Sequence, residues 1–507
     1  MTALALHGVT PGAGLAAATT PAPATMELSI EEGIAMLLKH NLDIVVERIK
    51  PRIETARVEG GWGIFDREVF TSLNYNDSKR PLNSRSSTAA GSISSMESRV
   101  YTLNMGVSAM TTLGTEYSLE FDDEWTKDTL NDFDTEHDTF AGLRLTQPLL
   151  KGFGRDATLF EIGLAKKERD ISVHRLKQRI IDTVSEFELT YWELVLTREE
   201  LRVKSESLKL AEELLELNRS KFEAGVASAL EVTQAEAGVA TRREALISAG
   251  KLVSEGENAL KLLISGDVYG LRDTEIVPTD APPPPTLWPM EPSLQEGVRK
   301  AVEVRPDYNE LRAELEKNDI RIKYAENQRF PEVDLEASFG YNGLGTSFNN
   351  SIEGMDSNPQ WGVGVVFRYP LGNRTARSEE RIARLESEAA LFKLKRLEQE
   401  IVVALDNAIK ELHTSRERFG AAKVSTRFAE ETLIAEEVKL EAGLSTTYNV
   451  LEMQEDLEEA KLSEIDALID YASAVTVFLR EEGTLLDKRG IEFRLPEEVQ
   501  GVEMSGR

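Results

Sequence analysis

Two proline-free segments, residues 156–222 and 374–440, constrain this chain more than any other feature of its sequence. They are equal in length and place apolar side chains at steps of three and four residues, as helices of a coiled coil do. At about 1.5 Å per residue each helix would be about 100 Å long, whereas helices of globular domains average about 11 or 12 residues. We therefore expect an elongated protein. The apolar stripes comprise Val173, Leu176, Ile180, Val184, Phe187, Tyr191 and Leu194 in the first segment, and Leu394, Leu397, Ile401, Leu405, Ala408 and Leu412 in the second.

Each long segment ends in a matching reversal, with Gly225 after Phe222-Glu-Ala and Gly443 after Leu440-Glu-Ala. Glycine just beyond a helix supplies the left-handed cap, so the sequence predicts antiparallel returning helices over about 226–264 and 445–482. Shorter helices, about 29–58 and 293–328, open the two halves of the chain.

The two halves share further phrases in the same order. Residues 29–43 match residues 293–307 at an offset of 264, and residues 211–232 match residues 429–450 at an offset of 218. A tandem duplication accounts for these matches, and the difference between the offsets gives the first half 46 additional residues. The predicted division is 1–27 as a signal-like or flexible segment, 28–265 as the first repeat, 266–292 as a Pro-rich linker, 293–490 as the second repeat and 491–507 as a tail.

Between the opening and the long helix of each half, the apolar period changes to two. The second half shows it near 333–341 and 361–369, and the first half in four segments within 69–145. The additional 46 residues correspond to a hairpin, about 100–125, turning at Leu113-Gly114-Thr115. Such strands fit a membrane β-barrel and fit equally a half-buried soluble sheet.

Composition excludes several classes of function. The formal charge of −29 disfavours nucleic acid as a partner, and the absence of cysteine excludes disulfides and thiolate chemistry. Five scattered histidines give no metal site, and no apolar run is long enough for a membrane-spanning helix. The chain also lacks the nucleotide-binding, zinc-protease and hydrolase motifs, so we expect no enzyme activity, no cofactor and no resident metal.

Long coiled-coil helices with paired strands, in two copies, resemble the TolC-type outer-membrane efflux proteins over about residues 28–490. The residues that carry the resemblance are the opening phrases, the prolines Pro148 and Pro370 before the long helices, and the turns at 221–232 and 439–451. The resemblance implies a mainly α fold with membrane β-strands. Three chains would share one outer-membrane β-barrel, and their helical hairpins would form an α-barrel in the periplasm. Six strands per chain would give 18 in the trimer; the alternative leaves the hairpin outside the bilayer and the barrel at 12.

The resemblance also implies roles for the turns. Contacts with a periplasmic adaptor would fall on the six tip residues, although a helix cap and core packing account for the same residue types. Residues six and nine positions after each glycine would line the periplasmic gate. Leu440 and Ser445 replace the tyrosine and arginine that lock the second turn in the family, so another network would have to close the mouth. The tip residues are Phe222, Gly225, Val226, Leu440, Gly443 and Leu444, and the gate residues are Glu231, Gln234, Asn449 and Glu452.

The function expected from this resemblance is a passive exit duct, opened by the adaptor and powered by an inner-membrane transporter. Its expected partners are two further copies of the chain, the adaptor, the transporter and outer-membrane lipid. The alternatives are an elongated coiled-coil structural or adhesion protein of the cell surface and, with no motif in its favour, a soluble enzyme.

Overall fold

The computed structural model describes residues 24–89, 91, 93–129, 134–226, 228–285 and 292–494. Most of the signal-like segment, part of the Pro-rich linker and most of the C-terminal tail lie outside these ranges. The chain forms two compact units, each built from segments of both predicted repeats. Within the described ranges, no helix combines the length and the apolar character needed to cross a membrane. The first unit comprises Met1–Leu42, Thr183–Pro289 and Glu411–Thr476, and the second comprises Asp43–Asp182, Met290–Lys410 and Val477–Arg507.

Four long helices dominate the helical part of the chain, and all were predicted close to their observed bounds. The two long helices are α5, Phe160–Glu223, and α10, Arg374–Glu441, with 64 and 68 residues. A single turn, α4 (Arg155–Thr158), precedes α5. The returning helices are α6, Ala229–Ile264, and α11, Thr447–Glu482, with 36 residues each.

The opening helices differ from the prediction because each is broken after about three turns. The first divides at Asn41 into α1 (Ile30–His40) and α2 (Leu42–Gly61), and the second divides at Arg305 into α7 (Leu294–Val304) and α8 (Pro306–Asn327). Asn41 and Arg305 have the same extended backbone, with φ near −62° and ψ of 123° and 128°. Pro306 explains the second break, because a proline disfavours helical geometry in the residue before it.

The opening helices pack against the long helices through a glycine in each half. In the first unit, a β-carbon on Gly33 would lie 2.1 Å from Cζ of Phe187, so only glycine admits that ring. In the second unit, Gly297 faces Leu405 at 3.7 Å. The two glycines and their two partners are related by the same pair of offsets as the repeated phrases, so the packing is duplicated together with the sequence.

A parallel pair of short strands, β1 (Ala24–Leu28) and β6 (Thr274–Pro278), was not predicted. The buried Tyr191 holds it against α5, because its hydroxyl donates to the Leu28 carbonyl and accepts from the backbone N–H groups of Thr279 and Asp280, each at 3.0 Å.

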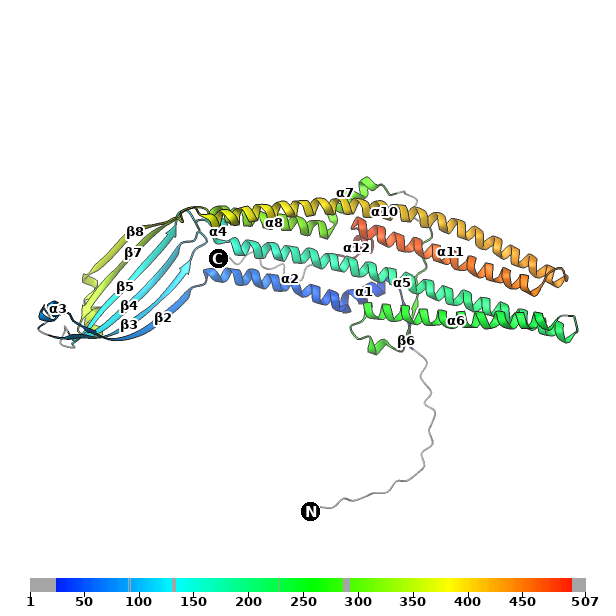
Figure 1. Ribbon diagram of the computed structural model, residues 1–507, viewed down its shortest axis with the longest axis horizontal. Helices are drawn as coiled ribbons and strands as arrows, with labels where there is room; N and C mark the ends of the chain where they lie inside the picture. Colours follow the sequence, from blue (N-terminus) through cyan, green and yellow to red (C-terminus); the bar gives the residue numbers. More distant parts are fainter. Residues whose placement is uncertain are drawn as a thin grey trace, which may run out of the picture. The chain divides into compact units, whose positions relative to one another are not determined.

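The second unit contains a six-stranded antiparallel sheet with the order β2-β3-β4-β5-β7-β8 (Figure 1). The six strands per chain predicted from the sequence are therefore present. The predicted additional hairpin is β3–β4, which lies between β2 and β5 and turns at Gly114, whose φ is +86°. The strands are β2 Glu68–Pro81, β3 Ser95–Met110, β4 Glu116–Asp128, β5 Thr135–Pro148, β7 Glu332–Gly345 and β8 Pro359–Arg368. Short helices in this unit are η1 Trp62–Phe65, α3 Ser84–Ala89, α9 Phe348–Glu353, η5 Met355–Ser357 and α12 Leu485–Lys488.

Candidate functional site: a two-faced sheet and two helical turns

The six-stranded sheet presents an apolar face and a charged face. Its register is continuous, so all odd-numbered strand residues share one face and all even-numbered ones share the other. The odd-numbered face, here the apolar face, has a central row that crosses every strand and is largely exposed. That row consists of Val69, Val107, Leu119, Leu143, Phe339 and Trp361.

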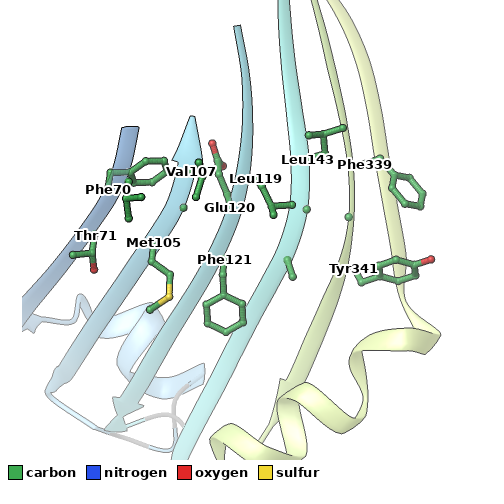
Figure 2. Close-up of a pocket in the computed structure, with 15 residues that line it drawn as sticks. Phe70, Thr71, Met105, Val107, Leu119, Glu120, Phe121, Leu143, Phe339 and Tyr341 are labelled. Carbon is green, nitrogen blue, oxygen red and sulfur yellow. The ribbon is translucent and has the colours of Figure 1, made fainter. Parts of the chain in front are cut away.

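A shallow groove of about 700 Å³ crosses the apolar face beside this row. Figure 2 shows Leu119 and Leu143 on adjacent strands. Phe121 and Tyr341 lie nearer the end of the sheet where α9 lies, here called the loop side. The groove is lined almost entirely by carbon, which is the lining expected of a surface that contacts hydrocarbon rather than water.

A row of aromatic rings bounds the apolar face on the loop side. Tyr75, Tyr101, Trp125 and His137 lie in register on four adjacent strands, with successive ring centroids 4.6, 4.5 and 6.0 Å apart. Phe348 of α9 meets His137 edge-on at 6.2 Å. Aromatic residues at the border of an apolar band are typical of strands that enter a membrane interface.

Helix α9 folds over the same border and covers a polar pair there. His137 Nδ1 lies 3.2 Å from Oδ1 of Asp123, and both side chains are largely buried. Glycine permits this packing, because a β-carbon on Gly343 would lie 1.9 Å from the Ser351 carbonyl oxygen.

The even-numbered face, here the charged face, is strongly acidic. Carboxylates far outnumber guanidinium groups on it, so this face requires water. Its acidic residues are Glu68, Glu116, Glu120, Asp122, Glu124, Asp128, Glu136, Asp138, Glu332, Asp334 and Glu336, and its basic residues are Arg80, Arg144 and Arg368.

The two helical turns in the first unit have nearly identical backbones. Gly225 and Gly443 have φ of +76° and +74°, and the residue after each donates its N–H to a carbonyl in the last helical turn, at 2.9 Å from Val226 and 2.8 Å from Leu444. These are glycine C-caps of the predicted kind.

The predicted tip residues divide into two groups by exposure. Val226 and Leu444 are 75% and 80% exposed, and Phe222 is about half exposed. Leu440 instead packs against a buried cluster that includes Leu214 and Val450, so its immediate role is core packing.

The predicted gate residues have local structural contacts. Glu231 closes a capping box with Ser228, because its carboxylate accepts from the Ser228 N–H at 3.1 Å while the Ser228 hydroxyl accepts from the Glu231 N–H. Asn449 donates to the Ser445 hydroxyl at 3.2 Å. Gln234 is half-buried and Glu452 is exposed. Among the described residues, no hydrogen bond or ion pair joins two of these four.

Sequence reasoning missed Glu436, which organises the second turn. Its carboxylate accepts hydrogen bonds from Lys439, Ser445 and Asn449, and the bonds from Lys439 and Ser445 lower its pKa. The network occupies the second turn, at the position where the resemblance led us to expect an arginine in place of Ser445. No sequence pattern marks Glu436 among the many glutamates of α10.

A family model described as outer membrane efflux protein matches residues 84–266 and 297–477. The chain belongs to this family. Family membership places the protein in the outer membrane, and the apolar face of the sheet is compatible with this location. The pyoverdine export outer membrane protein OpmQ of Pseudomonas aeruginosa is 25% identical over 285 residues, which are 54% of this chain and 55% of OpmQ. The match thus spans about half the length of that relative.

Solved structures of outer-membrane channels share the fold. The Campylobacter jejuni CmeC channel aligns with a TM-score of 0.66 at 15% identity, covering 94% of this chain and 90% of CmeC. VceC of Vibrio cholerae aligns with a TM-score of 0.63 at 14% identity, covering 90% of this chain and 96% of VceC. The combination of long helical hairpins and a sheet is therefore the fold of known outer-membrane channels.

Proposed function

We propose that this outer-membrane efflux protein is a passive exit duct that works as a homotrimer. Its sheets close one β-barrel in the outer membrane, and its helical hairpins enclose a continuous path through the periplasm. A periplasmic adaptor opens the duct, and an inner-membrane transporter supplies the energy. The observation that carries the proposal is the two-faced sheet, whose apolar face suits lipid and whose acidic face suits a water-filled interior.

The length of the apolar face supports a membrane location. From Val333 to Gly345, which pairs with His137 of the aromatic row, β7 rises about 3.4 Å per residue and extends about 40 Å. At the tilt of about 40° typical of such barrels, this spans about 30 Å across the membrane, close to the thickness of its hydrocarbon.

The sheet order favours an 18-stranded barrel over a 12-stranded one. In the part of the chain that the structure describes, β2 and β8 each pair with one neighbour, so both edges are open to further copies. Because β3 and β4 lie between β2 and β5, excluding them from the bilayer would divide the sheet.

The helical turns are the proposed docking and gating region. Val226, Leu444 and Phe222 are large apolar side chains exposed at the turns, which suits them to an adaptor. Three copies of Glu231 and Glu452 would make the mouth attractive to cations. The Glu436 network is our candidate for the contacts that keep the second turn closed.

Extraction of outer membranes with detergent tests the proposal. We expect a heat-sensitive trimer that conducts ions in a planar bilayer, with multivalent cations blocking the current. Glu231→Gln combined with Glu452→Gln should weaken that block, whereas unchanged block would remove both residues from the gate. A monomeric, water-soluble product without conductance would refute the exit duct.

A further inference from the structure

The two helix breaks occupy equivalent positions in the two repeats and make equivalent contacts. Asn41 and Arg305 are related by the sequence offset of 264, and the carbonyl groups that they reach, those of Leu263 and Glu481, by the offset of 218. Asn41 Nδ2 donates to the Leu263 oxygen at 3.0 Å, and Arg305 Nη1 donates to the Glu481 oxygen at 2.9 Å. In each repeat the residue at the break therefore holds the last turn of the returning helix.

The chemistry of the two contacts differs. In the first unit the donor is a neutral amide. In the second unit Arg305 also donates to Oε2 of Glu481 at 2.8 Å and makes two bonds to the Asp307 carboxylate, at 3.1 and 2.7 Å. Arg480 donates to the Glu481 carboxylate at 2.6 Å, and Lys300 lies 3.2 Å from Glu482. The C-terminal end of α11, here called its base, is thus held by a network of charges, and the base of α6 is likewise its C-terminal end.

The charged network is partly buried but in contact with solvent. The side chains of Arg305 and Glu481 are each 13% exposed. Burial alone would raise the pKa of Glu481, but hydrogen bonds from Arg305 and Arg480 hold it below the ordinary glutamate value. A polar cavity of about 290 Å³ borders the network and is lined by Gln178, Ile181, Asp182, Arg305, Pro306, Arg480, Glu481 and Gly483. Small ions can enter a cavity of this size and screen the charges.

The helix end is shaped to receive the arginine side chain. Gly483 has φ of +81°, and a β-carbon there would lie 3.1 Å from Cγ of Arg305. The arginine stem therefore lies directly against the backbone that ends α11, which limits the other positions that its guanidinium group can take.

We propose that Arg305 is a positioning residue that fixes the base of α11 through a salt-sensitive ionic latch. The hydrogen bond from Asn41 to the base of α6 is neutral, and the ion pairs there join Glu257 to Arg198 and Lys261 instead. The consequence for gating rests on the proposed function. Because α11 is continuous from Thr447 to Glu482, a loosened base frees the helix that carries the second turn. Salt that screens this latch would then loosen the second hairpin.

Hydrogen–deuterium exchange of the full-length protein in detergent tests the latch without any need for conductance. Raising the salt from about 50 mM to about 1 M shortens the Debye length from more than 10 Å to about 3 Å. We expect amide exchange in the last two turns of α11 to accelerate several-fold. Unchanged exchange at the base of α11 would overturn the proposal.

Arg305→Asn gives the second latch the chemistry of the first. We expect about tenfold faster exchange at the base of α11 at low salt, and loss of the salt dependence, because charged hydrogen bonds are replaced by neutral ones. Arg305→Lys, which keeps the charge but loses the paired geometry, should retain part of the salt dependence. The matched control is Arg418→Asn, which removes ion pairs to Asp466 and Asp470 along the middle of α11 and should leave its base unchanged. An effect of Arg418→Asn at the base equal to that of Arg305→Asn would refute a specific latch.

Planar-bilayer recordings test the link to gating. In a conducting wild-type protein, Arg305→Asn should raise the frequency of spontaneous opening at low salt by several-fold, and the control Arg418→Asn should raise it less. Equal opening by wild type and Arg305→Asn would refute the link to gating. A wild-type protein that never conducts would instead refute the exit duct, and the exchange measurement would still decide the latch.

Discussion

Arginine substitutions on the central row of the apolar face test which strands lie in the bilayer. Leu119 of β4 and Leu143 of β5 are neighbours in this row and are 62% and 45% exposed. Substituting either one disturbs little packing within the chain, so the cost of the arginine reports mainly on the surrounding medium. Ser118, next to Leu119 but on the charged face, provides the matched control.

The expected cost follows from the position of the row. Phe339, which pairs with Leu143, lies midway along β7 between Val333 and Gly345, at the middle of the apolar span. An arginine at the midplane of a barrel costs about 2–4 kcal/mol and near the interface about 0–1 kcal/mol. We expect Leu119→Arg and Leu143→Arg each to lower the free energy of unfolding by about 2–4 kcal/mol per chain, and Ser118→Arg to change it by less than about 1 kcal/mol.

Urea unfolding in phospholipid vesicles gives the free energy, and the fraction of heat-sensitive trimer in isolated outer membranes gives the effect on assembly. A large cost for Leu143→Arg with none for Leu119→Arg would place the β3–β4 hairpin outside the bilayer and restore the 12-stranded barrel. If Ser118→Arg costs as much as Leu143→Arg, the assignment of the two faces is wrong.

Three further predictions concern the first unit, with one control variant, Tyr308→Phe, in the second unit. Tyr191→Phe should lower the free energy of unfolding by about 1–2 kcal/mol, because it leaves the backbone groups around the hydroxyl unpaired. Faster amide exchange in β1 and β6 would show this loss. The control Tyr308→Phe removes one hydrogen bond to Glu398 and should cost less than about 1 kcal/mol. Gly225→Ala and Gly443→Ala should each lower the free energy of unfolding by about 1 kcal/mol. The cost comes from the positive φ alone, because open space surrounds both glycines. Proteolysis at the turns should accelerate, and unchanged proteolysis would contradict this prediction. Because the pKa of Glu436 is lowered, its network should stabilise the second turn at neutral pH and lose that contribution as pH falls below the ordinary value of 4.5. The protection of the amides across residues 440–449, measured relative to the intrinsic exchange rate at each pH, should therefore fall at low pH in wild type but not in Glu436→Gln.

Elements with a long or regular sequence pattern were predictable. The stripes from Val173 to Leu194 and from Leu394 to Leu412 extend over many helical turns, so they outweigh local exceptions. The strands alternate so regularly that even the additional hairpin and its turn at Gly114 were found. The break at Arg305 carries a signal in Pro306, but the break at Asn41 has none and depends on a hydrogen bond to the distant Leu263.

The site residues were less predictable because their side chains have local partners. Ser228-Ala-Leu-Glu231 is a capping-box pattern, so the structural role of Glu231 was open to prediction from the sequence. The role of Glu436 was not, because it depends on where the turn places Ser445 and Asn449. The parallel pairing of β1 with β6 joins the end of the predicted signal-like segment to the linker after the first repeat, and neither strand is long enough to show a periodic signal.

The additional residues of the first half follow from the geometry of antiparallel sheets. Each antiparallel strand reverses the direction of the chain. Only an even number of strands therefore returns the chain to the end of the sheet from which it started, measured along the strands. The second half passes from α8 to α10 through one hairpin, β7–β8, and the first half passes from α2 to α4 through two. A single added strand would have started the long helix of the first half at the opposite end of the strands, away from α2. A complete hairpin is therefore the smallest insertion that widens the sheet, and strands of 16 and 13 residues with their connections account for most of the additional length. The alternation continues unchanged through this hairpin, so Leu119 faces the same medium as Leu143.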